Sequence, residues 1–241
     1  MKRETELCDG FAARARESGW LVYPETGGWD LLLVAQTAAR TEPGTQVGVQ
    51  AKLRANVEVI AQAMDAAPLH DFDERPIPNS LGAFVPKGPD FRTVLVPKWS
   101  GEFRALCRAL RLHVYTHGSE FRHVETVHVP PEGLRRTVNR YALPPIVPSW
   151  SGGAPSPKTL SGWRIGALRI CATLRARGFV SPADFKAHGI DSSRWVAGGW
   201  VTSTGPRGSI VYVPGPRAEA LPDVGYEAER DALVAADARA A

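Results

Sequence analysis

The sequence predicts two domains: an α/β domain over residues 1–142 and a small α+β domain over residues 159–215. Three observations lead to this expectation. Hydrophobic patterns typical of helices and of strands alternate along the first part of the chain. Residues 143–158 are rich in proline and glycine, which interrupt both patterns and indicate a semi-rigid linker. Beyond the linker the charge changes: residues 151–215 carry 8 Lys/Arg against 2 Asp/Glu.

The order of elements in the first part predicts helices packed on both faces of a mixed sheet. Gly19 is a typical helix end, and Asn56 is a typical helix start. In chain order we expect a helix over residues 3–18, strands over 20–23, 29–36 and 46–53, a helix over 56–67, a strand over 93–97, a helix over 102–110 and a strand over 113–116.

The basic part predicts three helices followed by a β-hairpin. The helices are expected over residues 159–177, 182–188 and 192–198, and the strands over 199–204 and 209–214. Ser181 and Pro182 form the preferred start of the second helix, and either Asp191 or Ser192 caps the third. Residues 216–241 carry 3 Lys/Arg against 6 Asp/Glu, which predicts a peripheral, acidic, Ala-rich tail that includes at most a short helix.

Several classes of protein are excluded by the composition. No apolar run approaches the roughly 20 residues of a membrane span, so no membrane partner is expected, and the charged first residues contain no signal-peptide core. The three cysteines, Cys8, Cys107 and Cys171, are far apart and argue against a disulfide framework or a zinc ribbon. These features predict a soluble cytoplasmic protein. Four histidines lack a zinc spacing and are expected to be ordinary ones: His113, His117, His123 and His128.

Two neighbouring strands carry residues that suit metal-dependent phosphate chemistry. Asp30 begins one strand, and Gln50 and Lys52 lie on the next, on the same face because side chains alternate. If the strands pair as a hairpin, Asp30 approaches that face. Asp30, the side-chain oxygen of Gln50 and the carbonyl of Ala51 then supply the oxygen ligands that Mg²⁺ prefers.

Lys52 would orient a water molecule and offset charge on a scissile phosphate. Taken one at a time, these residues have simpler explanations. An aspartate at a strand edge is more often a solvated turn residue, and a lysine among apolar residues more often marks an exposed strand face.

The motifs of the first 65 residues or so resemble the PD-(D/E)xK nuclease superfamily, in particular archaeal Holliday-junction resolvases and Mrr-type restriction endonucleases. Four motifs occur in the family's order: Glu4-Thr5-Glu6-Leu7 on the first helix, Gly19-Trp20 at the first strand, Asp30 followed by Leu31-Leu32-Leu33-Val34, and Gln50-Ala51-Lys52. The last is the Gln-x-Lys variant of the usual Glu-x-Lys pair. The resemblance implies a restriction-endonuclease-like αβββαβ core.

The resemblance also implies a catalytic set of Glu4, Asp30, Gln50 and Lys52. The family's glutamate on the first helix maps to Glu4, because Glu4 shares the stripe of Leu7 and Phe11 whereas Glu6 lies off it. Gln50 is neutral, so the site has one negative charge fewer and is expected to bind cations weakly. Glu25 either compensates for that charge or is a solvated loop residue.

The three helices and hairpin of the basic part resemble a winged helix-turn-helix. In such domains the third helix enters the major groove of DNA and the hairpin contacts the DNA backbone or minor groove. Trp195 and Trp200 are expected in the core. The alternative is a winged helix that binds a protein. The residues expected to contact DNA are Lys186, Ser192, Ser193, Arg194 and Arg207.

Together these patterns predict an endonuclease that hydrolyses DNA phosphodiester bonds with Mg²⁺ or Mn²⁺ and is positioned by its winged helix. Two alternatives remain open: a non-catalytic DNA-binding or regulatory protein that retains the nuclease fold, and a protein–protein adaptor. Related nucleases often act as homodimers in order to cut both strands, but no dimer interface can be identified in the sequence.

Overall fold

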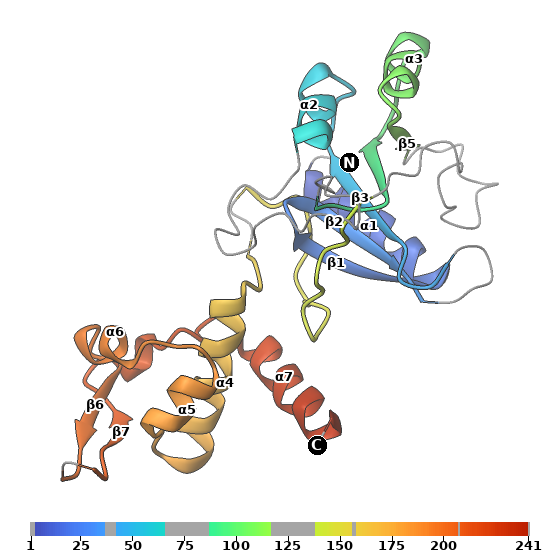
Figure 1. The fold of residues 1–241 in the computed structure, drawn as a ribbon. Coiled ribbons are helices and arrows are strands. Elements are labelled where there is room, and N and C mark those ends of the chain that lie inside the picture. The colour runs from blue at the N-terminus through green and yellow to red at the C-terminus, as the bar shows by residue number, and fades with distance from the viewer. Residues whose placement is uncertain are drawn as a thin grey trace, which may run out of the picture. The chain divides into compact units, whose positions relative to one another are not determined.

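The computed structural model describes residues 3–36, 42–65, 87–116, 138–155, 158–206 and 208–240. The chain divides into two compact units (Figure 1). Unit 1 contains residues 1–143 and 150–158, and unit 2 contains residues 144–149 and 159–241. Of the four histidines that were expected to be ordinary ones, His117, His123 and His128 lie outside the described residues.

Unit 1 is a mixed α/β unit, and the expected order of helices and strands is confirmed. Its elements are α1 (Glu4–Glu17), β1 (Trp20–Thr26), β2 (Trp29–Ala35), β3 (Gln46–Ala51), α2 (Val57–Asp65), β4 (Phe91–Val96), α3 (Gly101–Ala109) and β5 (His113–Thr116). The boundaries differ from the expected ones by a few residues, most of all at β1, which continues through Pro24 to Thr26. Proline is tolerated there because β1 is an edge strand of the sheet.

The five strands form one mixed sheet in the order β1-β2-β3-β4-β5. The pairs β1–β2 and β2–β3 are antiparallel, and the pairs β3–β4 and β4–β5 are parallel. Helices α2 and α3 make the crossovers that parallel neighbours require. In the β2–β3 register Leu31 lies opposite Val49, so the start of β2 adjoins the end of β3.

Each face of the sheet is covered by its own hydrophobic cluster. On one face α1 contributes Leu7, Phe11 and Ala15, which pack against strand residues such as Val49 and Ala51. On the other face α2 and α3 pack against a cluster that includes the fully buried Trp29. Gly48 is required beneath that ring, because a Cβ atom there would lie 2.4 Å from Cδ2 of Trp29. The hydrophobic clusters on the two faces together hold the start of β2 and the end of β3 in place.

Unit 2 consists of helices and one hairpin: α4 (Gly162–Arg177), α5 (Pro182–Ala187), α6 (Ser192–Ala197), β6 (Val201–Thr204), β7 (Val211–Pro214), a 3₁₀ turn (Ala218–Ala220) and α7 (Glu227–Ala240). Phe185 of α5 and Trp195 of α6 are buried with α4 residues in one cluster. The loop after α4 joins the hairpin through a bridge between Val180 and Tyr212. Trp195 is buried as expected, whereas Trp200 is only partly buried.

The acidic segment 216–241 is an integral part of unit 2 and not a peripheral tail. Leu233 of α7 is buried against Leu168 of α4 and Ile146. Asp223 is completely buried, and its carboxylate accepts hydrogen bonds of 2.7 Å and 2.6 Å from Arg175 Nε and Arg230 Nη1. The sequence did not predict this packing because most apolar residues of 216–241 are alanines and large apolar side chains are few.

The expected linker over 143–158 is divided between the two units. Residues 144–149 belong to unit 2, where the backbone N–H and the hydroxyl of Ser149 both donate to Glu229 at 3.1 and 2.5 Å. Residues 150–158 belong to unit 1. The prolines prevent a regular helix or strand, as expected, but they do not keep the segment away from the folded units.

All three cysteines are buried and free, so none of them forms a disulfide. In the described part of the chain, no helix is both long enough and apolar enough to cross a membrane. His113 lies on β5, where its ring makes an edge contact with Tyr115 at a centroid distance of 4.7 Å.

Candidate functional site

The residues expected to form the site come from α1, β2 and the end of β3. Asp30 is the second residue of β2, and its Oδ2 accepts a 2.7 Å hydrogen bond from the backbone N–H of Ala51. The antiparallel β2–β3 register produces this contact, since it places the start of one strand beside the end of the other. Asp30 therefore lies next to the Gln50-Ala51-Lys52 segment.

Lys52 follows directly after β3, and its ammonium group lies between two carboxylates. Its Nζ is 3.5 Å from Oε2 of Glu4 on α1 and 3.8 Å from Oε1 of Glu58 on α2. These helices pack on opposite faces of the sheet, so Lys52 lies at the end of the sheet between their N-termini. Glu4 is half-buried whereas Glu6 is exposed, in agreement with the choice of Glu4.

Gln50 is buried, and its amide nitrogen Nε2 donates a 2.7 Å hydrogen bond to the carbonyl of Gly28 in the β1–β2 turn. A backbone carbonyl can only accept, so this contact fixes which end of the amide is the nitrogen. The oxygen Oε1 is consequently the atom that Gln50 can offer to a cation. The bond also ties the end of β3 to the turn that precedes Asp30.

The environment of Asp30 disfavours its charged form. Burial is the main cause and raises the pKa of Asp30 to about 6, with a smaller contribution from Glu4; the hydrogen bond from Ala51 and the charge of Lys52 act in the opposite direction. A carboxylate whose negative charge is not fully compensated is stabilised when a cation binds to it. This property fits a metal ligand better than a purely structural aspartate.

Glu25 is a further carboxylate at this end of the sheet. In the β1–β2 hairpin Pro24 pairs with Leu31 and Thr26 with Trp29, so Glu25 lies across from Asp30. Burial raises the pKa of Glu25 to about 7, and the neighbouring Asp30 adds to the shift. Glu25 also has a left-handed backbone, with φ of 50°. The sequence left the role of Glu25 open, and the only signal there was its position beside the turn.

The donor set fits Mg²⁺ in its chemistry, because Asp30, Oε1 of Gln50 and the carbonyl of Ala51 are all oxygen ligands. Only one of these three ligands is negatively charged, so binding is expected to be weak. Within the described ranges, no group of three or more His, Cys, Asp or Glu side chains is arranged to hold a metal ion.

Residues 150–154, expected to belong to a linker, lie against this site. The hydroxyl of Ser151 donates to Asp9 of α1 at 3.0 Å, and the backbone N–H of Ala154 donates to Glu25 at 3.2 Å. Between them Gly152 and Gly153 are buried. No local sequence pattern indicates such a contact, because its partners are more than a hundred residues away.

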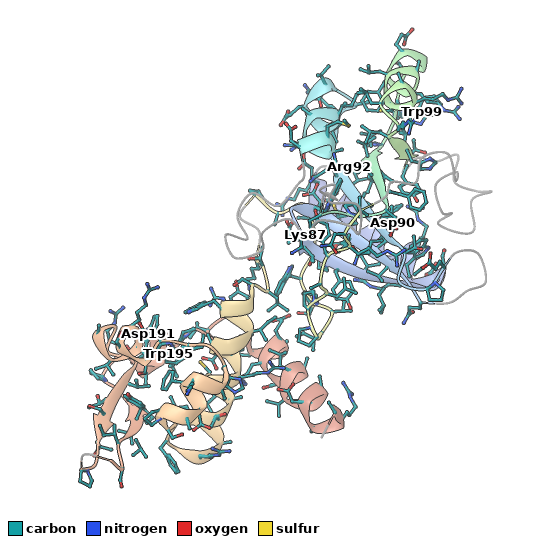
Figure 2. All side chains as sticks on the ribbon, in the orientation of Figure 1. Lys87, Asp90, Arg92, Trp99, Asp191 and Trp195 are labelled. Atoms are coloured by element: carbon teal, nitrogen blue, oxygen red, sulfur yellow. The ribbon has the colours of Figure 1, made fainter. Side chains whose placement is uncertain are left out.

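Of the residues in unit 2 that are expected to bind DNA, Ser192, Ser193 and Arg194 lie on α6 and Lys186 lies on α5. Lys186, Ser193 and Arg194 are exposed. Ser192 is half-buried, and its hydroxyl lies 3.1 Å from the hydroxyl of Tyr212 on β7. Asp191, labelled in Figure 2, caps α6 by accepting from the N–H of Ser193. Arg207 lies outside the described residues.

The positive charge of this unit is smaller than the sequence suggested. Residues 144–149 and 159–241 together carry ten Lys/Arg and eight Asp/Glu, a net charge of +2. Several arginines are paired with acids of the C-terminal segment, as in the bond of 2.8 Å between Arg169 Nε and Asp237. The charge argument for DNA binding therefore applies to the exposed residues around α6 and not to the unit as a whole.

Comparisons of the chain with protein family models, with curated proteins and with solved structures gave no match.

Proposed function

We propose that unit 1 is a metal-dependent DNA endonuclease with a restriction-endonuclease-like core, and that unit 2 is a winged helix that positions it on DNA. One observation carries this proposal: the contact of Lys52 with Glu4, beside the contact of Asp30 with Ala51. Residues from α1, β2 and the end of β3 thus meet at one end of the sheet. These residues are the ones that the resemblance to the PD-(D/E)xK superfamily requires, and they occur in the required order along the chain.

In this proposal Asp30, Gln50 and Ala51 hold a Mg²⁺ or Mn²⁺ ion. The ion supplies electrostatic stabilisation of charge on the scissile phosphate. Lys52 orients the attacking water and stabilises negative charge that develops on the phosphate. Glu4 and Glu58 hold the ammonium group in place through ion pairs of 3.5 Å and 3.8 Å.

The winged-helix proposal is supported by the arrangement of α4, α5 and α6 with the β6–β7 hairpin. The hairpin joins the helices through Val180 and Tyr212, and Trp195 fixes α6 on the core. The exposed side of α6 carries Ser193 and Arg194, and Lys186 is exposed on α5. A short exposed helix with a cationic residue near its N-terminus suits the major groove.

The test is a cleavage assay on plasmid, branched and single-stranded DNA, with Mg²⁺, Mn²⁺ or EDTA. Cleavage is expected with either metal and not with EDTA. Lys52→Ala is expected to reduce cleavage at least about 10³-fold, because it removes charge stabilisation at the phosphate, and to leave DNA affinity nearly unchanged. Arg16→Ala is the matched control, since it removes an exposed cation from the opposite end of α1. Cleavage by Lys52→Ala at the wild-type rate would refute the site.

A DNA-binding protein without nuclease activity is the second candidate. The bond between Gln50 and Gly28 favours it, because a neutral side chain in a structural contact replaces the usual acidic ligand. In that case wild-type protein would bind DNA with a steep salt dependence but would leave every substrate intact with either metal. Salt-insensitive or absent DNA binding would instead favour the adaptor.

A further inference from the structure

The strap, residues 150–154, lies across the candidate site and is held at both ends. At one end Ser151 donates to Asp9 of α1, and at the other Ala154 donates to Glu25 of β1. Asp9 is on the helix that carries Glu4, and Glu25 lies across from Asp30. The two anchors therefore lie on the elements that carry Glu4 and that face Asp30.

Between the two anchors the backbone of the strap packs directly against residues of α1 and β2. A Cβ atom on Gly152 would lie 2.2 Å from the carbonyl oxygen of Asp30 and 2.7 Å from Cδ2 of Leu31. Gly153 has φ of 72°, and a Cβ atom there would lie 3.0 Å from Sγ of Cys8 and 3.3 Å from Cβ of Glu4. The strap thus packs directly against the backbone of Asp30 and against Glu4, two of the predicted catalytic residues.

Both ends of the strap continue into unit 2 along the chain. Residues 144–149 precede it and belong to unit 2, where Ser149 is held by Glu229. Residues from 159 onward follow it and also belong to unit 2. The strap is therefore part of segment 150–158 of unit 1, which is joined to unit 2 along the chain on both sides.

We infer that the strap is an autoinhibitory element that covers the site in free protein and is lifted when unit 2 binds DNA. This inference depends on the proposed nuclease function. The hydrogen bonds that anchor the strap come from neutral donors: the hydroxyl of Ser151 and the backbone N–H groups of Gly153 and Ala154. Each such bond contributes only about 1 kcal/mol, so DNA binding can displace them. Lifting the strap also frees the carboxylate of Glu25 beside Asp30.

Gly152→Ala tests the inference, because its Cβ atom cannot coexist with the backbone of Asp30. In the full-length protein this variant is expected to cleave plasmid DNA at least tenfold faster than wild type. Gly162→Ala is the matched control, since a Cβ atom there meets nothing within 4 Å, and it should cleave at the wild-type rate. Ser151→Ala, which removes only one anchor, should give a smaller increase.

Hydrogen exchange of the strap amides, read by mass spectrometry, gives a second measurement independent of cleavage. Slow exchange is expected in free wild type, and fast exchange in Gly152→Ala and in wild type with duplex DNA. Equal exchange in all three, or slower cleavage by a folded Gly152→Ala, would overturn the inference. Failure of the nuclease proposal is seen separately, as no cleavage by any variant with either metal, and the exchange data then decide about the strap alone.

Discussion

Asp30 in unit 1 and Asp223 in unit 2 are both poorly accessible to solvent, yet their surroundings are opposite. Burial would raise the pKa of Asp223, but hydrogen bonds from Arg175 and Arg230 outweigh it and lower the pKa below its usual value. Asp30 receives one backbone N–H and the partial influence of Lys52, and its pKa is raised to about 6. Full compensation of a buried charge is typical of structural roles, whereas partial compensation leaves a carboxylate ready for a ligand.

The largest expected effect concerns Asp223. Asp223→Ala leaves two arginines without their buried partner and should lower the free energy of unfolding of unit 2 by about 3–5 kcal/mol. Asp237→Ala is the matched control, because it breaks a more exposed pair with Arg169 and should cost at most about 1 kcal/mol. Calorimetric unfolding of the full-length variants measures both, and equal losses would remove the distinction between the two carboxylates.

Gln50→Glu should sharpen the comparison by adding the charge that the site of Asp30 lacks. We expect about tenfold tighter Mn²⁺ binding in calorimetric titration, since a second carboxylate attracts the cation. The variant should also lose about 1–3 kcal/mol of stability without metal, because its carboxylate would face the Gly28 carbonyl. Gln36→Glu, an exposed addition of the same charge, should change neither quantity. Unchanged Mn²⁺ affinity in Gln50→Glu would place residue 50 outside the metal's ligands.

Among the basic residues of unit 2 a similar contrast exists between an arginine in a bidentate ion pair and an exposed one. Arg194 is exposed on α6, whereas Arg169 is bonded to Asp237. Arg194→Ala should weaken binding to duplex DNA by on the order of 1–3 kcal/mol if the side chain contacts a base, and relax sequence preference. Arg169→Ala should change affinity much less. Fluorescence anisotropy over a range of salt concentrations compares them, and equal losses would contradict a specific role for α6.

The last expected effect is the pH dependence of unit 1. In the folded protein the pKa values of Asp30 and Glu25 are raised to about 6 and about 7, so the folded state binds protons that the unfolded state does not. Unit 1 should therefore become more stable as pH falls from above 7 towards about 5. Each kcal/mol gained in the free energy of unfolding should raise Tm by about 2–4 °C.

Unit 2 should behave differently, because the pKa of Asp223 is lowered. The stability that Asp223 provides is fully present above its usual pKa of 3.8 and is lost only as pH falls below that value. Calorimetry at pH 5, 6, 7 and 8 follows the two transitions. Asp30→Asn should flatten the response of unit 1, and an unchanged slope in this variant would show that another group causes it.

The sequence predicted those parts of the fold that depend on periodicity and local punctuation. The alternating patterns located the helices and strands of unit 1. The stripe that contains Leu7 identified the side of α1 that packs against the sheet. The contact between Asp30 and Ala51 followed from hairpin pairing, which adjacent strands commonly adopt.

Two features could not be predicted, because they arise from contacts between residues far apart in the chain. Asp223 looked like one acid in a polar tail, and only its two arginine partners make it part of a core. The strap has no periodicity, and its glycines were equally consistent with an open linker. Their close packing becomes evident only when Asp30 and Cys8 are placed beside them.

The way the chain passes between the two units has a consequence for dividing the protein into fragments. A fragment that starts at about residue 156 contains every helix of unit 2 but lacks Ile146, which helps to bury Leu168 and Leu233, and Ser149, which binds Glu229. A fragment that starts at residue 144 keeps both but carries the strap without its docking surface. No single cut between residues 143 and 159 yields two fragments with complete interiors, so a sound C-terminal fragment needs residues 144–149 joined to 159 by a new short connection.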